Sequence, residues 1–331
     1  MRAVLMGKDK FLPYRVGGLL YIPANKNGVA DKIANNAYPC LSSIAFDLED
    51  SVQDRFICKA EETLLATLGD ISKIDTSCAN MPLIFVRVRN PEHLRAFAWK
   101  LSWAGLSITG FILPKFDVSN ASEYMKALRD LQGLFKEAIY GMPVLESRLV
   151  ASLGTRVAML EEIRDVLDKN RELILNIRVG GNDLSNLYGI RRSSSQTIYE
   201  VGVVRDILSN IINVFGADYV VSAPVWEYFG NDNQKLWRAG LAKEVEQDLL
   251  NGFFGKTAIH PCQLPVIAES MMVDELDYQD AKMIVSWPDE ALAVRKSFDG
   301  TRMNELKCHL NWAQKTLFRA EVYGVRGGSF R

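Results

Sequence analysis

The residues most able to do chemistry are acids that directly follow short apolar runs. Glu146 closes such a run in PVLES, and Asp183 follows another run and the pair Gly180–Gly181 in VGGNDL. Two carboxylates from separate strands, with water completing an octahedron, are a typical way of holding Mg2+. The glycines lack side chains and would let the backbone approach a ligand closely. The alternative is that each acid merely caps the helix that follows it.

Basic side chains follow two further apolar runs and could bind an anionic substrate. Arg87 and Arg89 in FVRVRNP share one face of a strand, because side chains alternate across a strand, and Lys115 closes the run ILPK. A guanidinium that points from a strand end into a polar cavity can bind a carboxylate in bidentate fashion. A structural ion pair with nearby acids is the alternative for each of these residues.

An acidic motif, FDLED, ends another apolar run. Asp47 and Glu49 share one face of this extended segment, and Asp50 follows them. Two acids on one face repel each other unless a cation lies nearby, so the motif indicates a charged site that contains Asp47. The alternative is a helix N-terminus with acids in its first turn.

Histidine contributes little to the predicted chemistry. His260, in GKTAIHPCQ, could be a base or a ligand at a strand end, but only His93 and His309 accompany it in the chain. Neither is near it in sequence, so a multi-histidine metal site is not expected. The sequence also lacks a Walker A motif, G-x-G-x-x-G and the nucleophile pattern G-x-S-x-G.

A repeated alternation of strands and helices would position these residues. Short apolar runs predict eight strands, and most are followed by a segment in which apolar residues recur at helical spacing. The predicted strands are Gly18–Pro23, Ser43–Leu48, Leu83–Val88, Thr109–Pro114, Met142–Glu146, Leu173–Val179, Tyr219–Ser222 and Thr257–Ile259. Strands that alternate with helices indicate right-handed βαβ units and a parallel sheet.

Eight such units favour an α/β fold of the (β/α)8 TIM-barrel type, of about 250 residues, because no Pro/Gly/Ser-rich linker interrupts the alternation. A doubly wound sheet is the alternative. After about Ala281 the pattern changes, and apolar residues from Leu306 to Ala320 predict a final helix. We therefore predict a TIM-barrel domain over residues 1–281 and a C-terminal helical lid or oligomerisation segment over residues 282–331.

Composition argues against several partners and locations. The 331 residues include 39 basic and 40 acidic ones, so no overall positive field attracts nucleic acid. No run approaches the roughly 20 apolar residues that span a bilayer, and the N-terminus lacks the apolar stretch of a signal peptide. The five cysteines form no C-x-x-C pair and indicate reduced thiols. We expect a cytoplasmic protein with neither a nucleic-acid nor a membrane partner.

The ordered motifs resemble the citrate lyase beta-subunit family of TIM-barrel lyases. They are LLYIPANK, FDLEDSV, FVRVRN, ILPK, PVLES, GGNDLSNLYGIRR and GKTAIHPCQ, and the resemblance covers about residues 17 to 275. Members of this family cleave or form carbon–carbon bonds in citryl, malyl, citramalyl or β-methylmalyl thioesters of coenzyme A or acyl carrier protein, usually with Mg2+. The resemblance implies a carbon–carbon lyase for a small oxo-acid or acyl-thioester substrate.

Carried across position by position, the resemblance implies Glu146 and Asp183 as metal ligands, with Asp47, Arg87 and Lys115 lining the site. Asp47 and Arg87 would be catalytic, and Arg87 and Lys115 would bind substrate. Mg2+ would act as Lewis acid and template for retro-Claisen or retro-aldol cleavage, while Arg87 offsets the charge of the enolate. Coenzyme A would enter only as part of the substrate. Family members form trimers or hexamers, so a homotrimer or homohexamer is expected.

The sequence departs from the family pattern at the strand-one arginine, which is Gly17 here, and at the base. In CoA-dependent relatives a C-terminal segment of a neighbouring subunit brings an aspartate that acts as base, but Asn304 occupies that place. An amide cannot accept the proton, so Glu305, Asp299 or Asp47 would have to replace the aspartate. This altered set resembles a divergent bacterial branch of the family, whose substrates are not established.

Three functions are therefore compatible with the sequence. The first is a Mg2+-dependent carbon–carbon lyase or condensing enzyme for an oxo-acid-derived substrate. The second is another metal-enolate barrel, of the pyruvate or phosphoenolpyruvate type, that acts on a free acid. The third, motivated by Asn304, is a catalytically silent scaffold similar to citrate lyase.

Overall fold

The computed structural model describes residues 9–77, 79–230, 235–288 and 292–327. Its main sheet has eight strands, and each of them overlaps one of the predicted strands. The strands are β1 Gly18–Pro23, β2 Ser43–Asp47, β3 Leu83–Arg87, β4 Gly110–Leu113, β5 Tyr140–Leu145, β6 Ile177–Val179, β7 Val221–Ser222 and β8 Lys256–Ala258. The largest difference is at the sixth strand, whose expected beginning at Leu173 lies in a 3-10 turn, η2 (Arg171–Leu173).

The eight strands run in the order β7-β6-β5-β4-β3-β2-β1-β8 and pair in parallel. A further parallel bridge joins Ala223, directly after β7, to Lys256 on β8. This bridge links the two ends of the sheet and closes it into a barrel. The predicted (β/α)8 fold is therefore confirmed, and the doubly wound alternative is wrong.

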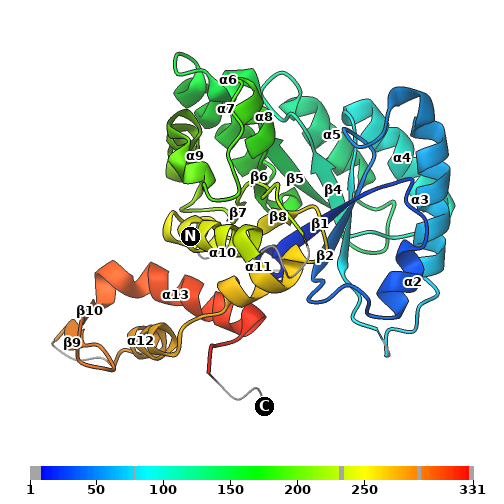
Figure 1. Ribbon diagram of the computed structural model, residues 1–331. Coiled ribbons are helices and arrows are strands. Elements are labelled where there is room, and N and C mark those ends of the chain that lie inside the picture. Colours follow the sequence, from blue (N-terminus) through cyan, green and yellow to red (C-terminus); the bar gives the residue numbers. More distant parts are fainter. Residues whose placement is uncertain (1–8, 78, 231–234, 289–291, 328–331) are drawn as a thin grey trace. The chain divides into compact units, whose positions relative to one another are not determined.

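Helices follow the strands and cover the outside of the barrel, as Figure 1 shows for α3, α4, α5, α7 and α9. The longer ones are α3 Ile57–Ile71, α4 Pro91–Trp103, α5 Ala121–Leu131, α7 Arg156–Asp168, α9 Gly202–Phe215, α10 Lys235–Leu250 and α11 Gln263–Met271. The shorter ones are α1 Leu12–Arg15, α2 Val29–Ala34, α6 Arg148–Ala151, α8 Gly181–Asn186, η1 Asp54–Phe56 and η3 Ile198–Glu200. Across the described ranges, no helix combines the length and hydropathy needed to cross a membrane.

Local sequence explains where these helices begin and which face they bury. The Asn90 side chain accepts a hydrogen bond from the backbone N–H of His93, and Pro91 occupies the first turn, so α4 begins at Pro91. One apolar face of α9 is buried, and it includes Val204, Leu208 and Phe215. Burial of one apolar face, rather than helix propensity alone, stabilises such helices.

A packed apolar core fills the barrel interior beneath the C-terminal ends of the strands. Its buried members are Val16, Leu19, Ala45, Phe85, Ile112, Met142, Val144 and Leu175. Because these side chains fill the interior, polar chemistry is restricted to the C-terminal ends of the strands, as in other barrels of this type.

A buried charge cluster joins β8 to α10. The Nζ atom of Lys256 lies 2.7 Å from Glu244 Oε1 and 2.7 Å from Asp248 Oδ2, and Arg192 also contacts Glu244 at 3.0 Å. Lys256 and Glu244 are completely buried. Because each charge has a partner and further hydrogen bonds, we regard this cluster as structural.

The chain divides into two compact units, Met1–Ile267 and Ala268–Arg331. The second contains α12 Glu275–Val285, a hairpin of β9 Val294–Lys296 and β10 Met303–Glu305, and α13 Leu306–Tyr323. Its small apolar core includes residues of both helices. The predicted boundary after residue 281 places most of α12 with the barrel, whereas the structure groups α12 with α13. The role of this unit as a lid or oligomerisation segment stays a prediction.

Candidate active site

Glu146 lies directly after β5 and is buried at the C-terminal end of the barrel, with 6% of its surface exposed. Its Oε1 atom accepts a hydrogen bond of 2.8 Å from the backbone N–H of Lys115. Its Oε2 atom faces Gly180, where an added Cβ would lie only 1.9 Å away. Glu146 can therefore occupy this position only because residue 180, at the end of β6, has no side chain.

Asp183 is the second acid at this place. It lies in the first turn of α8 and is partly exposed. Burial, and then the negative charge of Asp183, raise the pKa of Glu146 to about 8. No Lys or Arg forms an ion pair with Glu146 in the described part of the chain. An uncompensated pair of acids of this kind favours a bound cation.

The donor set of Glu146 and Asp183 fits Mg2+ rather than a softer metal. Both supply carboxylate oxygens, which hard divalent cations prefer. Among the described residues, no three His, Cys, Asp or Glu side chains gather in a group that could hold a metal by themselves. Water and substrate would complete the coordination, as is usual for Mg2+.

Arg87 is bound by the acids of the FDLED motif. Its Nε lies 2.6 Å from Asp47 Oδ1 and its Nη2 lies 2.8 Å from Oδ2, which makes a bidentate pair. Its Nη1 lies 3.0 Å from Glu49 Oε2 and 3.2 Å from Asp50 Oδ2. Burial works to raise the pKa of Asp47, but the hydrogen bonds and charge of Arg87 lower it overall. Arg87 therefore forms an ion pair with these acids, and this pair fixes its guanidinium at the end of β3.

Lys115 connects the two acidic groups. Its φ of 49° is in the left-handed region, which is uncommon for a residue other than glycine. Its backbone N–H donates to Glu146, while its Nζ pairs with Glu49 and lies 3.5 Å from Asp50. The predicted residues Asp47, Arg87, Lys115 and Glu146 are thus brought together through direct contacts.

Two residues that were not among the sequence predictions belong to the same end of the barrel. Arg178, in the middle of β6, is 1% exposed, and its charge acts on the hydroxyl of Tyr21 on β1. The Cζ atom of Arg87 lies 5.3 Å from the centre of the Tyr21 ring. Arg178 precedes Gly180 by two residues, so alternation along the strand could have indicated that it faces inward.

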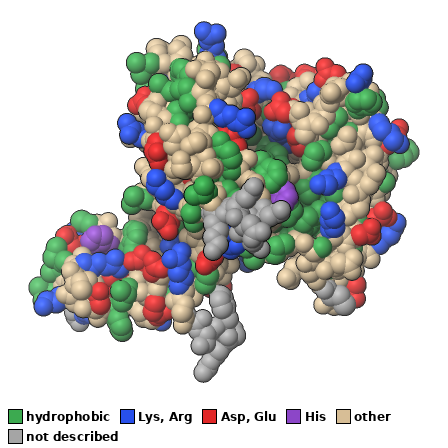
Figure 2. All heavy atoms as spheres, in the orientation of Figure 1, with side chains coloured by type: hydrophobic (Ala, Val, Ile, Leu, Met, Phe, Trp, Pro, Cys, Tyr) green, Lys and Arg blue, Asp and Glu red, His purple; other side chains and the backbone are tan. Residues whose placement is uncertain are grey.

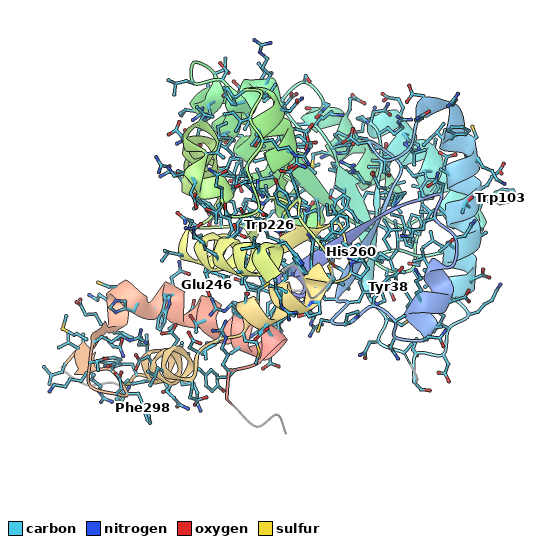
Figure 3. All side chains as sticks on the ribbon, in the orientation of Figure 1. Tyr38, Trp103, Trp226, Glu246, His260 and Phe298 are labelled. Carbon is cyan, nitrogen blue, oxygen red and sulfur yellow. The ribbon has the colours of Figure 1, made fainter. Side chains whose placement is uncertain are left out.

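His260 is a peripheral member of this end of the barrel. Its Nδ1 lies 3.0 Å from Cys262 Sγ, and its ring stacks on Phe229 with a centroid distance of 4.6 Å. Figure 3 labels His260 and Trp226 where the strands end, and Figure 2 shows a histidine beside a recess lined with hydrophobic side chains. His93 instead pairs with Glu61, at 2.8 Å, outside the site.

The alternative bases Asp299 and Glu305, together with Asn304, lie in the C-terminal unit. Asn304 on β10 is 3% exposed, which leaves its amide little access to a ligand. Asp299 accepts hydrogen bonds from Ser297 and Thr301, and these lower its pKa to about 2. A carboxylate with so low a pKa is a weak base, so Asp299 is poorly suited to the proton transfer.

Two curated relatives match nearly the whole chain. A citrate lyase subunit beta-like protein of Deinococcus radiodurans is 24% identical over 301 residues, which cover 88% of this chain and 94% of the relative. A (3S)-malyl-CoA thioesterase of Cereibacter sphaeroides is 25% identical over 320 residues, which cover 96% of this chain and 98% of the relative. Both matches extend across the barrel and the C-terminal unit.

Solved structures share the fold. CitE from Mycobacterium tuberculosis, in complex with magnesium, acetoacetate and coenzyme A, has a TM-score of 0.62 at 20% identity, covering 93% of this chain and 99% of CitE. A citrate lyase from Burkholderia xenovorans has a TM-score of 0.68 at 14% identity, covering 95% of this chain and 94% of its own. At these identities the likeness supports the architecture and not a particular substrate.

The decisive comparison is with a family of carbon–carbon bond lyases. Its sequence profile matches residues 10–325, which include all eight barrel strands and both C-terminal helices. The resemblance inferred from the ordered motifs is thereby confirmed, together with the lyase class that it implied. The chain belongs to the family of C–C bond lyases of the TIM-barrel fold.

Proposed function

We propose that this lyase requires Mg2+ and cleaves or forms the carbon–carbon bond of an oxo-acid-derived substrate. The observation that carries the proposal is the environment of Glu146. This carboxylate is 6% exposed, lies beside Asp183 and has a pKa raised to about 8. Two neighbouring acids in a poorly solvated place are stable as anions when a cation binds them.

Glu146 and Asp183 would hold the metal. The backbone N–H of Lys115 orients Glu146, and Gly180 leaves the space that the carboxylate occupies. When bound, Mg2+ supplies Lewis-acid chemistry that polarises the carbonyl and carboxylate oxygens of an oxo acid. The protein's part is to hold these two acids at a fixed place despite their mutual repulsion.

Arg87 and Lys115 would bind and stabilise the anionic parts of the substrate. Asp47 fixes the orientation of Arg87 through the bidentate pair, and Glu49 holds Lys115. The Lys115 side chain is 55% exposed, so a substrate can reach it directly. Fixed positive groups near a developing enolate lower its energy without reorganising during the reaction.

We further propose a CoA thioester, such as a citryl, malyl or citramalyl unit, as the substrate. One relative is a malyl-CoA thioesterase, and the related CitE structure contains coenzyme A and acetoacetate. We also propose a homotrimer or homohexamer in the cytoplasm, assembled through the C-terminal unit. These features rest on the family resemblance and on the length of the matches.

Calorimetric titration with Mg2+ tests the metal site. The unmodified protein should bind Mg2+, and Glu146→Gln or Asp183→Asn should weaken binding by at least about tenfold, because each removes one anionic ligand. Glu62→Gln is a matched control, since Glu62 is an exposed acid on α3 that pairs with Lys59. Unchanged affinity in both site variants would show that the metal assignment is wrong.

The products identify the reaction. Release of oxaloacetate, glyoxylate or pyruvate from an acyl thioester would support the proposed lyase. Turnover of free hydroxy or oxo acids only would instead support an enzyme of the pyruvate or phosphoenolpyruvate type. Metal binding without turnover in a broad screen would support the scaffold alternative.

A further inference from the structure

Arg178 is a buried cation whose charge is not balanced by a carboxylate among the described residues. Its Nη2 donates to Thr257 Oγ1 at 2.6 Å, and its charge acts on the hydroxyl of Tyr21. Its Nε and Nη1 atoms are buried and have no hydrogen-bond partner. Burying a charge with unsatisfied donors destabilises a fold, so Arg178 requires an explanation other than stability.

Two other buried arginines of the barrel show the usual arrangement. Arg156 donates to the carbonyl oxygens of Val150 and Ala151 and pairs with Asp206 at 2.5 Å. Arg192 pairs with Glu244. Each has a carboxylate partner, whereas Arg178 donates to the neutral hydroxyl of Thr257. The positive charge of Arg178 is therefore not offset by a neighbouring carboxylate, and it acts on Tyr21.

Arg178 lies close below the proposed metal ligands. It pairs in register with Val144, two residues before Glu146, and precedes Gly180, which touches Glu146, by two residues. Since side chains alternate across a strand, Arg178 and Gly180 face the same interior of the barrel. The buried guanidinium is thus one layer beneath the acid that would bind the metal.

Tyr21 connects Arg178 to the mouth of the barrel. Its ring packs on the apolar core, and the side chain remains partly exposed. Burial raises the pKa of its hydroxyl, and the charges of Arg178, Arg87, Asp47 and Glu146 also act on this group. Tyr21 is therefore a partly exposed side chain whose hydroxyl lies among the charged groups of the site, one of which is the buried cation Arg178.

We propose that Tyr21 is a catalytic residue whose hydroxyl donates a hydrogen bond to the substrate oxygen on which negative charge develops, and that Arg178 is its positioning residue. The positive charge of Arg178 beside this hydroxyl makes the hydroxyl a stronger hydrogen-bond donor. A phenol keeps its proton near neutral pH, so Tyr21 can serve as a donor without transferring that proton. The inference rests on the proposed function, since it places an oxo-acid oxygen near Glu146 and Asp183.

Oxalate is a suitable probe, because it is a planar dianion that resembles the enolate of an oxo acid. We expect Tyr21→Phe to weaken oxalate binding to the Mg2+-loaded full chain by about 10- to 150-fold, which is typical for loss of one hydrogen bond to a charged group. Its Mg2+ affinity should not change. Tyr199→Phe is the control, because Tyr199 donates to Asp248 in the buried cluster, and its oxalate affinity should equal that of the parent.

Arg178→Met should weaken oxalate binding by a similar factor. The double variant Arg178→Met/Tyr21→Phe should bind oxalate little more weakly than either single variant, because both residues act through one hydroxyl. Arg178→Lys should restore part of the affinity. The melting temperature of Arg178→Met should stay the same or rise, since an unpaired buried charge is removed. In the control Arg156→Met it should fall, because that arginine is fully paired.

The outcomes separate the two proposals. Parent-like oxalate affinity in Tyr21→Phe overturns this inference alone, as do independent, additive effects of Tyr21→Phe and Arg178→Met. A parent chain that binds no Mg2+ overturns the proposed function and this inference with it. Should Arg178→Met fail to fold, Tyr21→Phe decides the matter, since it removes a single oxygen atom from a partly exposed side chain.

Discussion

Glu146 and Gly180 lie so close together that a Cβ on residue 180 would be 1.9 Å from Oε2 of Glu146 and 2.6 Å from its Cβ. The two residues follow the neighbouring strands β5 and β6. Gly181 is similarly confined, since its Cβ would lie 2.5 Å from Pro224. Glycine is therefore required at both positions for steric reasons. Gly180 leaves space for the buried carboxylate of Glu146, and Gly181 leaves space for the loop that contains Pro224.

Gly180→Ala should displace Glu146 and weaken Mg2+ binding by at least about tenfold, because one of its carboxylate ligands would move. Calorimetry would measure the effect. Gly69→Ala is the control, since Gly69 lies in α3 with no atom within 4 Å of an added Cβ. That change should stabilise the chain by roughly 0.5–1 kcal/mol without affecting Mg2+. Normal metal binding by Gly180→Ala would contradict the assigned position of Glu146.

Mg2+ affinity should rise with pH up to about 8, because the metal binds the carboxylate form and burial beside Asp183 raises the pKa of Glu146 to that value. Below pH 8, binding should release a proton. Titrations in buffers of different ionisation enthalpy would count it, and Glu146→Gln should abolish the release. A proton count of zero at pH 7 in the parent would contradict the raised pKa.

The same carboxyl group should affect stability in the metal-free protein. Its folded pKa of about 8 is above its ordinary value of 4.5, so between these limits the folded chain holds a proton that the unfolded chain releases. The contribution of Glu146 is therefore full below about pH 4.5 and is lost as pH rises to about 8. Denaturant unfolding would measure the free energy of unfolding of the parent and of Glu146→Gln across this pH window. As pH rises, the parent should lose stability relative to the variant.

Asp47→Asn should reduce the free energy of unfolding by about 3 kcal/mol, because it leaves the largely buried guanidinium of Arg87 without its main partner. The pKa of Asp47 is lowered, so this contribution is present at neutral pH and is lost as pH falls through the lowered value. Asp54→Asn is the control, since the Asp54 side chain is 93% exposed beside Arg89. Urea unfolding at pH 7 would measure both variants. Equal free energies of unfolding for Asp47→Asn and Asp54→Asn would contradict the structural role of Asp47.

Truncation after Met272 should leave a folded barrel, because the second unit has its own core and Val273 already pairs with Val325 inside it. Truncation at residue 281 instead cuts α12 and should give an aggregating product. Light scattering would report whether the shorter chain loses the expected oligomer. An unchanged oligomer and unchanged activity would exclude the C-terminal unit as a lid or assembly segment.

Much of the fold was predictable, because the signals for strands and helices are local. Short apolar runs such as LLYIP and SIAFD appear as β1 and β2, and the segment that follows the sixth strand forms the helix α9 with one apolar face buried. The unpredicted hairpin β9–β10 has strands of three residues, too short for a periodic pattern. The unit boundary also depends on contacts between α12 and α13, which no local pattern records.

The sequence by itself determined the barrel, the family and the candidate residues at the strand ends. Only the tertiary structure decided which charges meet: Arg87 is held by Asp47, Glu146 lies against Gly180, and Arg178 has a neutral phenol, that of Tyr21, beside its buried charge. The physical reason is that Coulomb energies and hydrogen bonds depend on distances of a few ångströms across the closed barrel. These distances join residues up to 157 positions apart in the chain (Tyr21 and Arg178, 178 − 21 = 157), and spacing along one strand does not contain them.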